Sequence, residues 1–395
     1  MMPCVAPLVS VRIGRRVLRW KRFVECPQDC CAHGIWSNLL RRIQRGNIPA
    51  QKFEIFAFWK SVRQRHRIEN PLALALDMTS TSDLADYFLR ACEEAAIAAA
   101  KWRGRGEGKK ADGAAVEAMR AVFDSVPFDG RVAIGEGERD DAPMLYIGEP
   151  LGSLQGVDGA PKIDIAVDPL ECTNNCATDS PNAIAVLAAA PRGALLHAPD
   201  CYMDKIAGGP ELNGVLSLEA STDWNIEAAC SALDRKASDL KVVVMDRPRH
   251  EKLIKELRAL DVSVPLIGDG DVSAALNAAD PNSDIDMLMG IGAAPEGVIT
   301  ATALRGLGGH FEGQLVTTNE DHSRRAAEMV GDDVDRIWGR DELCTSDDAI
   351  FVASGVCSGY LPGVEFLGPN RVAVHSEILH VMDGRRQFVS SEKSL

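Results

Sequence analysis

The pattern of apolar and polar positions is clearest in the strand predicted at residues 163–167. Apolar residues dominate this stretch, and Pro169 predicts its end because proline donates no ladder hydrogen bond. Three oxygen-bearing side chains lie close by, those of Asp168, Glu171 and Thr173. Hard divalent cations prefer rigidly held oxygen ligands, so this strand end predicts the metal and phosphate centre of a phosphatase. A polar turn with solvated acids is the alternative.

Before residue 200 the same pattern predicts two helices and two further strands. Apolar residues recur three and four positions apart in the first helix, and they run almost continuously in the second strand. We expect helices at 83–102, with Ser82 as N-cap, and at 111–122, and strands at 131–135 and 182–188. The glycine-rich stretch between the helices lacks the ending of a P-loop, so it predicts a flexible turn. Asp112 falls in the first turn of the second helix.

After about residue 240 the pattern changes to an alternation of short strands and helices. Strands are expected at 241–245, 262–267, 285–289 and 349–353, and helices at 251–260, 272–279, 295–307 and near 320–331. Such alternation is typical of an α/β layer. We predict three segments: a basic extension at 1–75, a half at 76–240 that carries the metal and phosphate site, and an α/β half at 241–395 that completes it.

Composition narrows the classes of function. Of the 395 residues, 46% are hydrophobic and 25% charged, which is typical of globular proteins. No apolar run approaches the ~20 residues that span a bilayer, and the net charge of −14 argues against general nucleic-acid binding. We therefore expect neither a membrane nor a nucleic acid as partner. The eleven scattered cysteines favour reduced thiols in an intracellular protein, and Cys26, Cys30 and Cys31 lack the second pair of a zinc site.

The N-terminal segment differs from the rest of the chain in charge. Residues 1–70 carry 14 Lys and Arg against 4 Asp and Glu, whereas the remainder is strongly acidic. This reversal marks a boundary. The segment resembles an organellar presequence, because it is rich in arginine and poor in acids. A basic arm for nucleic acid or anionic membrane, and a stretch upstream of the true start, are the alternatives.

Polar groups also lie at other predicted strand and helix ends. Glu136 stands between two glycines in an acidic turn, where it could approach a cation closely or simply be solvated. Arg247 and Arg249 lie at a predicted helix start, which suits a phosphate because backbone donors and guanidinium groups act together. Residues 269–271 could accept hydrogen bonds from sugar hydroxyls or cap a helix. Residues 290–297 predict a glycine-rich turn into a helix with Glu296 in its first turn.

Seven short motifs occur in a characteristic order. They are A-D-G-A-A-V at 111–116, I-G-E-G-E at 134–138, D-P-L-E-C-T at 168–173, P-N-A-I-A-V-L-A at 181–188, R-P-R-H at 247–250, D-G-D-V at 269–272 and A-P-E-G-V at 294–298. Together they closely resemble the class II fructose-1,6-bisphosphatases, which belong with inositol monophosphatase to the lithium-sensitive, metal-dependent phosphatases. The resemblance covers roughly residues 82–390.

The resemblance implies a five-layer αβαβα sugar-phosphatase fold. It also implies hydrolysis of the 1-phosphate of fructose 1,6-bisphosphate to fructose 6-phosphate and phosphate, with Mg²⁺ or Mn²⁺, in gluconeogenesis or the Calvin cycle. The implied metal ligands are Asp112, Glu136, Asp168, Glu171 and Glu296. Thr173 would orient the attacking water, held by a nearby acid, with Asp112 and Glu136 sharing the catalytic role. The implied substrate contacts are Glu171, Cys172, Thr173, Tyr202, Arg247, Pro248, Arg249, Asp269, Gly270, Asp271 and Ala293.

Two positions depart from the family pattern, which has glycine where this chain has Cys172 and Ala293. Glycine permits unusual backbone angles, so Cys172 could crowd the site. Cys172 and Cys176 could form a redox-sensitive pair, although two buried thiols are the more ordinary reading. Cys172 and the basic N-terminal segment leave open a catalytically impaired sugar-phosphate binder. A broader enzyme that also takes sedoheptulose 1,7-bisphosphate is a second alternative, because one extra carbon alters only loop contacts. We expect a homo-oligomer, dimer or tetramer, in the cytoplasm, or in an organelle if residues 1–75 are a genuine presequence.

Overall fold

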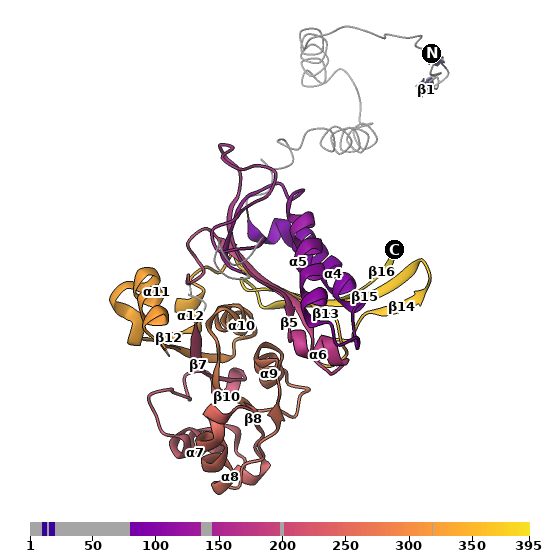
Figure 1. The fold of residues 1–395 in the computed structure, drawn as a ribbon. Coiled ribbons are helices and arrows are strands. Elements are labelled where there is room, and N and C mark those ends of the chain that lie inside the picture. Colours follow the sequence, from indigo (N-terminus) through magenta and orange to yellow (C-terminus); the bar gives the residue numbers. More distant parts are fainter. Residues whose placement is uncertain (1–9, 14–15, 20–79, 136–143, 198–200, 318) are drawn as a thin grey trace. The chain divides into compact units, whose positions relative to one another are not determined.

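The computed structural model describes residues 10–13, 16–19, 80–135, 144–197, 201–317 and 319–395 (Figure 1). The chain divides into two units, Met1–His66 and Arg67–Leu395. In the first unit, strands β1 (Ser10–Ile13) and β2 (Arg16–Arg19) pair in antiparallel fashion. In the described part of the chain, no helix is long and apolar enough to cross a membrane.

In the second unit, described strands form an eight-stranded sheet in the order β14-β15-β13-β6-β5-β3-β4, with β16 paired to β15. Among these described strands, only β3 and β5 are parallel neighbours. The strands are β3 (Asp129–Ile134), β4 (Pro150–Leu151), β5 (Lys162–Glu171), β6 (Ile184–Pro191), β13 (Ile350–Gly355), β14 (Glu365–Gly368), β15 (Arg371–His380) and β16 (Arg385–Ser394). Strands β5, β6 and β13 are almost wholly buried, so layers must cover both faces of this sheet.

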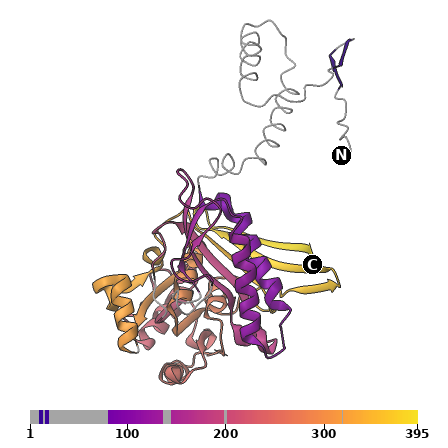
Figure 2. The ribbon, with the colours of Figure 1, turned by 45° about the horizontal axis from the view of Figure 1, so that its top comes forward.

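Two antiparallel helices cover one face of this sheet, as Figure 2 shows. They are α4 (Ala85–Ala100), which follows the 3₁₀ turn η1 (Thr81–Leu84), and α5 (Gly108–Phe123). Their apolar faces bury Phe88 and Phe123 against Phe128, with ring centroids 5.9 to 6.5 Å apart. Ser80, not Ser82, caps the entry by accepting a hydrogen bond from the Asp83 amide, so the predicted N-cap is wrong by two residues.

A second, six-stranded sheet has the order β12-β11-β7-β10-β8-β9 in the described residues. Its strands are β7 (Tyr202–Gly208), β8 (Val242–Met245), β9 (Leu266–Ile267), β10 (Met287–Ala293), β11 (His310–Val316) and β12 (Ile337–Gly339). The strands β10, β8 and β9 run parallel, whereas β7 and β11 run antiparallel to their neighbours. The predicted α/β alternation after residue 240 therefore supplies the parallel part, and β7 and β11 complete the sheet.

The remaining helices complete five layers, in agreement with the predicted αβαβα architecture. Helices α9 (Asp271–Ala278) and α10 (Ala294–Leu307) lie between the sheets, because their apolar residues pack in one cluster with β6 and β13 on one side and β7 and β10 on the other. Helices α7 (Thr222–Leu233) and α8 (Glu251–Ala259) cover the outer face of the second sheet.

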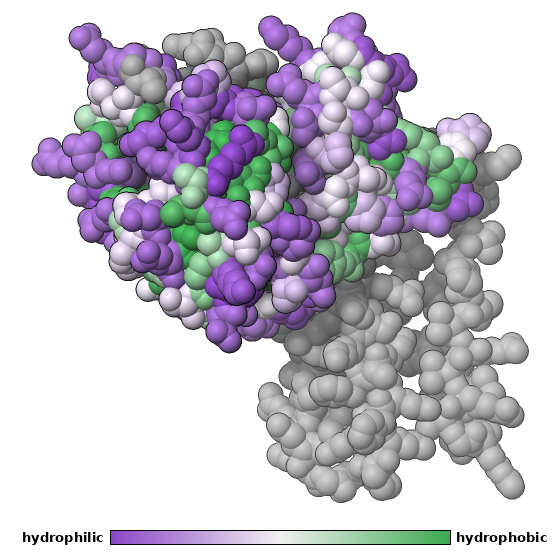
Figure 3. Space-filling model, turned by 90° about the horizontal axis from the view of Figure 1, so that it is seen from below, coloured by the Kyte–Doolittle hydropathy of each residue, from purple (hydrophilic) through white to green (hydrophobic). Residues whose placement is uncertain are grey.

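The solvent-facing surface agrees with this layering. Figure 3 views the molecule from the side on which α7 and α8 lie, and the surface there is largely hydrophilic with smaller hydrophobic areas between. Trp224 of α7 and Leu266 of β9 are among the exposed large hydrophobic residues. The described residues also include the helices α6 (Thr173–Thr178), α11 (Glu320–Val330) and α12 (Arg340–Leu343).

Several predicted boundaries are wrong, each for a local reason. Pro169 does not end the strand: β5 continues to Glu171, and its register against β6 shifts between Asp168 and Glu171, which is a place where a sheet tolerates proline. Gly290 and Gly292 belong to strand β10 rather than to a turn. The expected strand at 262–267 contracts to β9, and the ten-residue strands β15 and β16 were foreseen only as short ones.

Candidate active site

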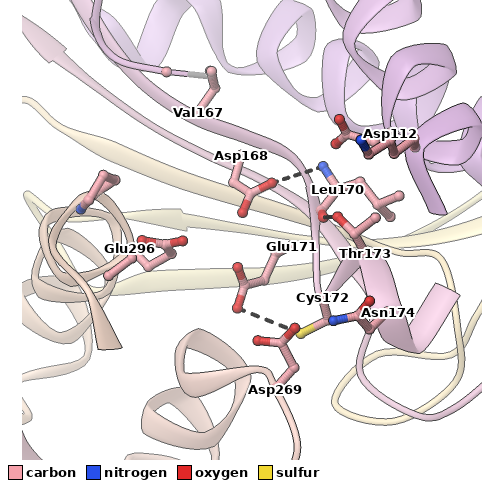
Figure 4. A pocket seen from close by; sticks show the side chains of 14 residues that line it. Asp112, Val167, Asp168, Leu170, Glu171, Cys172, Thr173, Asn174, Asp269 and Glu296 are labelled. Atoms are coloured by element: carbon pink, nitrogen blue, oxygen red, sulfur yellow. Dashed lines mark hydrogen bonds between the residues drawn. The ribbon is translucent and has the colours of Figure 1, made fainter. Parts of the chain in front are cut away.

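A cavity of about 440 Å³ opens where the ends of several elements converge (Figure 4). Acidic and hydroxyl side chains from four places in the chain line it: Asp112 from α5, Asp168, Glu171 and Thr173 from β5 and α6, Asp269 from the turn before α9, and Glu296 from α10. These residues come from both halves of the second unit. The cavity therefore exists only once both sheets and the helices between them are assembled.

Three of the five expected metal ligands form a close triad, which we call the carboxylate triad: Asp168, Glu171 and Glu296. One oxygen from each lies within 4.8 Å of the others. Asp168 and Glu171 lie on either side of the register shift at the end of β5. Glu296 lies in the first turn of α10, next to Pro295, a residue that favours helix starts. Figure 4 shows the three carboxylates facing a shared space from opposite walls.

The carboxylate triad holds more negative charge than its surroundings neutralise. Burial raises the pKa of Asp168 to about 6 and that of Glu296 to about 8, against the partial opposing effect of Lys205 on Glu296. Burial, followed by the nearby Asp168 carboxylate, raises the pKa of Glu171 well above its ordinary value. In the described residues no lysine or arginine forms an ion pair with any of the three. Desolvated like charges at this spacing favour either protonation or a bound cation.

The donor set fits a divalent metal ion. Glu296 Oε2 is buried and has no hydrogen-bond partner among the described residues, which is the condition of an oxygen ligand without its cation. Carboxylate oxygens are the donors that Mg²⁺ and Mn²⁺ prefer. Asp112 lines the same cavity outside the triad, and burial raises the pKa of its carboxyl. Glu136, the remaining expected ligand, lies outside the described residues.

A second group of possible ligands shares Glu171 with the triad and adds Cys172 and Asp269. Cys172 has the left-handed backbone (φ 68°, ψ 51°) that glycine adopts most easily. Its thiol lies 3.6 Å from Glu171 Oε1 and is 4% exposed. Asp269 and Cys172 were predicted as substrate contacts, and both lie beside the carboxylate of Glu171.

Thr173 begins α6 at the floor of the cavity. Its hydroxyl donates a hydrogen bond to the Leu170 carbonyl at 3.1 Å. The role of Thr173 in orienting an attacking water, held by a nearby acid, stays a prediction. The donated proton leaves the hydroxyl oxygen able to accept a hydrogen bond from a water molecule.

The arginines at the start of α8 lie beside the cavity rather than among the side chains that line it. Arg249 donates two hydrogen bonds to the Ile291 carbonyl, at 2.8 and 3.1 Å, and its guanidinium lies 4.9 Å from the centre of the Tyr202 ring. Arg247 lies near enough to Asp269 to lower the pKa of that carboxyl, although burial raises it overall. Tyr202 and Pro248 are exposed.

Comparisons with known proteins identify the family. The model of the bacterial, glpX-encoded fructose-1,6-bisphosphatases matches residues 82–393. The chain belongs to this family. A protein of Synechococcus sp. (strain JA-3-3Ab) is 43% identical over 327 residues, covering 74% of this chain and 94% of the relative.

Relatives from two other organisms agree with this assignment. One from Synechococcus elongatus (strain ATCC 33912 / PCC 7942 / FACHB-805) is 46% identical over 295 residues, with 69% of this chain and 86% of the relative covered. One from Prochlorococcus marinus (strain MIT 9303) is 44% identical over 322 residues, with 78% and 95% covered. All three are named D-fructose 1,6-bisphosphatase class 2/sedoheptulose 1,7-bisphosphatase.

Asp271 and Gly270 were predicted as substrate contacts, but neither is among the residues that line the cavity. The Asp271 carboxylate is buried and accepts a hydrogen bond from Lys205 Nζ at 2.6 Å. A side chain at Gly292 would clash with that carboxylate. Gly270 has φ +97° and caps α9, and a Cβ there would lie 2.9 Å from Cys172 Sγ. Ala293 lines the cavity as expected.

Two lysines near the cavity, Lys205 and Lys109, are not among the residues predicted from the sequence. Lys205 is 1% exposed in the middle of β7, and its charge opposes the rise in the pKa of Glu296. Lys109 lines the cavity from the first turn of α5. Lys205 stands in a largely apolar strand. A buried lysine needs an acidic partner, so this placement was the sequence signal that could have indicated its ion pair. No pattern marked Lys109.

Cys172 and Cys176 do not face each other as a redox pair would. The Cys172 thiol contacts Glu171, whereas the Cys176 thiol contacts the Ala99 carbonyl and lies next to Cys357. Every described cysteine is a free thiol. The reading of Cys172 and Cys176 as two buried thiols therefore agrees with the structure.

Proposed function

We propose that this protein hydrolyses the 1-phosphate of fructose 1,6-bisphosphate to give fructose 6-phosphate and phosphate, using a divalent metal ion. One observation carries the proposal: the carboxylate triad, with its unpartnered Glu296 oxygen, lines a polar cavity beside Thr173. Phosphoryl transfer needs positive charge around the phosphate and a positioned nucleophile more than covalent chemistry. The family to which the chain belongs carries that activity in its name.

The metal would be held by Asp168, Glu171 and Glu296, with Asp112 and Glu136 as further ligands. A bound cation supplies positive charge to the phosphate oxygens and lowers the pKa of a coordinated water. We propose Mg²⁺ or Mn²⁺, because the triad offers oxygen ligands alone. Rigid elements hold the three carboxylates in place for metal binding. Asp168 and Glu171 lie at the end of the buried strand β5, and Glu296 lies in the first turn of α10 between the two sheets.

Thr173 would position the attacking water. Its hydroxyl proton is engaged with the Leu170 carbonyl, so its oxygen accepts a hydrogen bond from a water molecule in the cavity. Asp112 and Glu136 are the proposed acidic partners that take up the proton of this water. Burial raises the pKa of Asp112 and so makes it a better proton acceptor than an exposed aspartate.

The substrate would extend from the triad toward the arginines. Arg247 and Arg249, at the start of α8, are the cations proposed to hold the 6-phosphate, and stacking on Tyr202 orients the guanidinium of Arg249. Asp269 and Gly270 lie between these two ends, where the sugar hydroxyls need acceptors and backbone donors. Pro248, Cys172, Asp271 and Ala293 complete the proposed contact set, with Asp271 acting through its ion pair with Lys205.

A phosphate-release assay tests the proposal. Purified protein with Mg²⁺ or Mn²⁺ should release phosphate from fructose 1,6-bisphosphate, and a chelator should stop the release until metal is restored. Bound sugar bisphosphate in calorimetry, without phosphate release under any metal, would instead establish a catalytically impaired binder.

A second substrate is favoured by the names of the relatives, which include sedoheptulose 1,7-bisphosphatase. We infer that the chain also accepts sedoheptulose 1,7-bisphosphate, whose additional carbon lies between the two phosphates. Parallel rate measurements on both bisphosphates and on inositol monophosphate test this. Comparable rates on the first two, with little on the third, are the expected result.

Assembly and location stay predictions. A homo-oligomer, dimer or tetramer, can be measured by light scattering on the purified protein. The cytoplasmic or organellar location depends on the basic segment 1–75, which lies almost wholly outside the described residues, and mass spectrometry of the mature N-terminus tests whether it is retained.

A further inference from the structure

His250, the last residue of the R-P-R-H motif, is a buried histidine to which the proposed chemistry gives no role. It is 2% exposed and ends the 3₁₀ turn η4 (Pro248–His250), which follows Arg247 and leads into α8. Both ring nitrogens have partners. Nδ1 lies 2.8 Å from the Met245 carbonyl oxygen, and Nε2 accepts a hydrogen bond from the Ile291 amide at 2.8 Å. The imidazole therefore joins the end of β8 to β10.

These two partners fix the protonation state of the ring. A carbonyl oxygen can only accept a hydrogen bond, so Nδ1 must carry a proton, and a backbone amide can only donate, so Nε2 must carry none. Burial lowers the pKa of His250, and the charges of Arg249 and Arg247 also lower it. The Met245 carbonyl and the Asp204 carboxylate oppose this shift only in part. The surroundings thus favour the neutral ring that the geometry requires.

The ring fills a gap between two strands that separate near their carboxyl ends. The described pairing of the parallel strands β10 and β8 covers residues 287–288, and β8 ends at Met245. Further along β10, two side chains take the place of the lost neighbour. His250 accepts a hydrogen bond from the Ile291 amide, and Arg249 donates two to the Ile291 carbonyl. The same residue of β10 therefore holds both the histidine and an arginine of the motif.

The backbone around the ring allows this close approach. Gly290 has φ +125°, and a Cβ there would lie 2.9 Å from His250 Nε2. The Met245 carbonyl also accepts a hydrogen bond from the Arg247 amide at 2.9 Å, and the His250 amide donates to the Arg247 carbonyl at 2.9 Å. The ring and the turn that carries the arginines are therefore held by the same backbone groups.

The position of this turn matters because other proposed substrate contacts lie at the same ends of neighbouring strands. Asp269 follows β9, and Ala293 ends β10 two residues after Ile291. The carboxyl ends of adjacent parallel strands form the crevice in which α/β proteins bind ligands. A shift of the arginine turn against β10 would therefore change the distance between the arginines and the rest of the proposed site.

We propose that His250 is a positioning residue: by joining Met245 to Ile291, it holds the turn of Arg247 and Arg249 where their guanidinium groups reach the 6-phosphate of the substrate. This inference rests on the proposed function, because it concerns the grip on that substrate. His250 itself does not touch the substrate and acts through the arginines. A histidine that only fills space between β8 and β10 is the competing explanation.

Two substitutions separate the two hydrogen bonds of the ring. In His250→Gln the side-chain oxygen can take the place of Nε2 and still accept from the Ile291 amide. In His250→Asn the side-chain nitrogen can take the place of Nδ1, so the Met245 bond is kept and the Ile291 bond is lost. His310→Asn is the matched control, since His310 is also buried and is not among the described residues that line the cavity.

Steady-state kinetics give the first readout. His250→Asn should raise KM for fructose 1,6-bisphosphate at least about 10-fold and change kcat less than about 3-fold, because it leaves a buried amide without its acceptor. His250→Gln and His310→Asn should stay within about 3-fold of the wild-type KM. Equal increases of KM in His250→Gln and His250→Asn would show that the ring only fills space, and would overturn the inference.

A substrate without the 6-phosphate sharpens the test. Fructose 1-phosphate lacks the group that the arginines would bind, so His250→Asn should change its kcat/KM less than about 3-fold. Equal losses on fructose 1-phosphate and on the bisphosphate would also overturn the inference. If circular dichroism shows that His250→Asn does not fold, Gly290→Ala gives the same comparison, since its Cβ would push the retained ring away from Ile291.

Calorimetry with fructose 6-phosphate needs no turnover, so it separates this inference from the proposed function. His250→Asn should weaken the binding at least about 10-fold and His250→Gln less than about 3-fold. Wild-type protein that shows this order of affinities but releases no phosphate would contradict the function alone. Wild-type protein that releases phosphate, with unchanged affinity in His250→Asn, would contradict only the role of His250. Neither binding nor release would contradict both.

Discussion

Two buried carboxylate groups in this protein are built in opposite ways. Glu377 of β15 is 0% exposed, and it accepts hydrogen bonds from Arg386 and, at 2.5 Å, from the Tyr360 hydroxyl. Arg386 also donates to Asp280 at 2.9 Å and to the Tyr360 oxygen at 2.8 Å. This network joins the C-terminal hairpin to the end of α9, and its charges are paired within the protein. Burial lowers the pKa of Arg386, but Tyr360, Glu377 and Asp280 together raise it above its usual range.

The carboxylate triad has no such partner. Burial raises the pKa values of all three acids, the Asp168 carboxylate raises those of Glu171 and Glu296 further, and Glu296 leaves an oxygen without a hydrogen bond among the described residues. Burying a charge without pairing it costs stability. The paired carboxylate of Glu377 and the unpaired carboxylates of the triad therefore have different roles in this protein. The Glu377 network holds layers together, whereas the triad is arranged to receive a cation from outside.

Removing a triad carboxylate should have the largest effect, and it should fall on activity. Asp168→Ala or Glu296→Ala is expected to lower phosphate release at least about 10³-fold, because the metal supplies several kcal/mol of transition-state stabilisation. Initial rates at saturating Mg²⁺, with circular dichroism to check folding, measure this. Full activity in both variants would contradict the site assignment.

Removing the paired carboxylate should act mainly on stability. Glu377→Gln removes the fully buried counter-charge of Arg386 and leaves Asp280 as its remaining ion-pair partner, which is expected to cost about 1.5 to 3 kcal/mol in the free energy of unfolding. Urea denaturation measures the loss. Glu392→Gln is the matched control on the same hairpin, because the ion pair of Glu392 with Arg371 is exposed and should contribute less than about 1 kcal/mol. Equal losses in the two variants would remove the contrast between the regions.

The stability of the metal-free carboxylate triad should also depend on pH. Folding raises the pKa of Asp168 from 3.8 to about 6 and that of Glu296 from 4.5 to about 8. The folded, metal-free chain thus binds more protons than the unfolded chain, so this contribution to stability is full below pH 4 and is lost as pH rises toward 8.

Metal should reverse this trend, because it binds only the deprotonated carboxylates. At 100 times its dissociation constant it adds about 2.7 kcal/mol, and the gain should be larger at pH 8 than at pH 5. Melting temperatures with chelator and with Mn²⁺, at both pH values, measure the two slopes. Glu296→Gln should flatten the metal-free slope, and an unaltered slope in that variant would refute the assignment of this titration.

The exposed cation beside the cavity should show the smallest effect. The stacking of Arg249 on Tyr202 is expected to contribute about 0.5 to 1 kcal/mol. Tyr202→Leu should therefore raise KM for fructose 1,6-bisphosphate about 2- to 5-fold while kcat changes little. Steady-state kinetics separate the two constants. A large fall in kcat would place Tyr202 in the chemical step instead of in substrate binding.

The sequence by itself determined the elements whose patterns are local. Buried strands such as β5 and β6, amphipathic helices such as α4 and α8, and the polar residues at their ends could be predicted because period, capping and turn chemistry depend on near neighbours. The motifs around Asp112, Asp168 and Glu296 also sufficed to indicate the family, which the comparisons confirm.

Only the tertiary structure decided which polar residues meet. The passage of β5 through Pro169 depends on a register shift against β6, and the place of Lys205 depends on Asp271 across from it, so neither could be read from neighbouring residues. Cys172 was foreseen as an obstacle, yet its sulfur faces Glu171 and Asp269 because a left-handed backbone and the turn before α9 bring them together. Contacts between segments distant in sequence depend on how layers pack, and local pattern does not encode that packing.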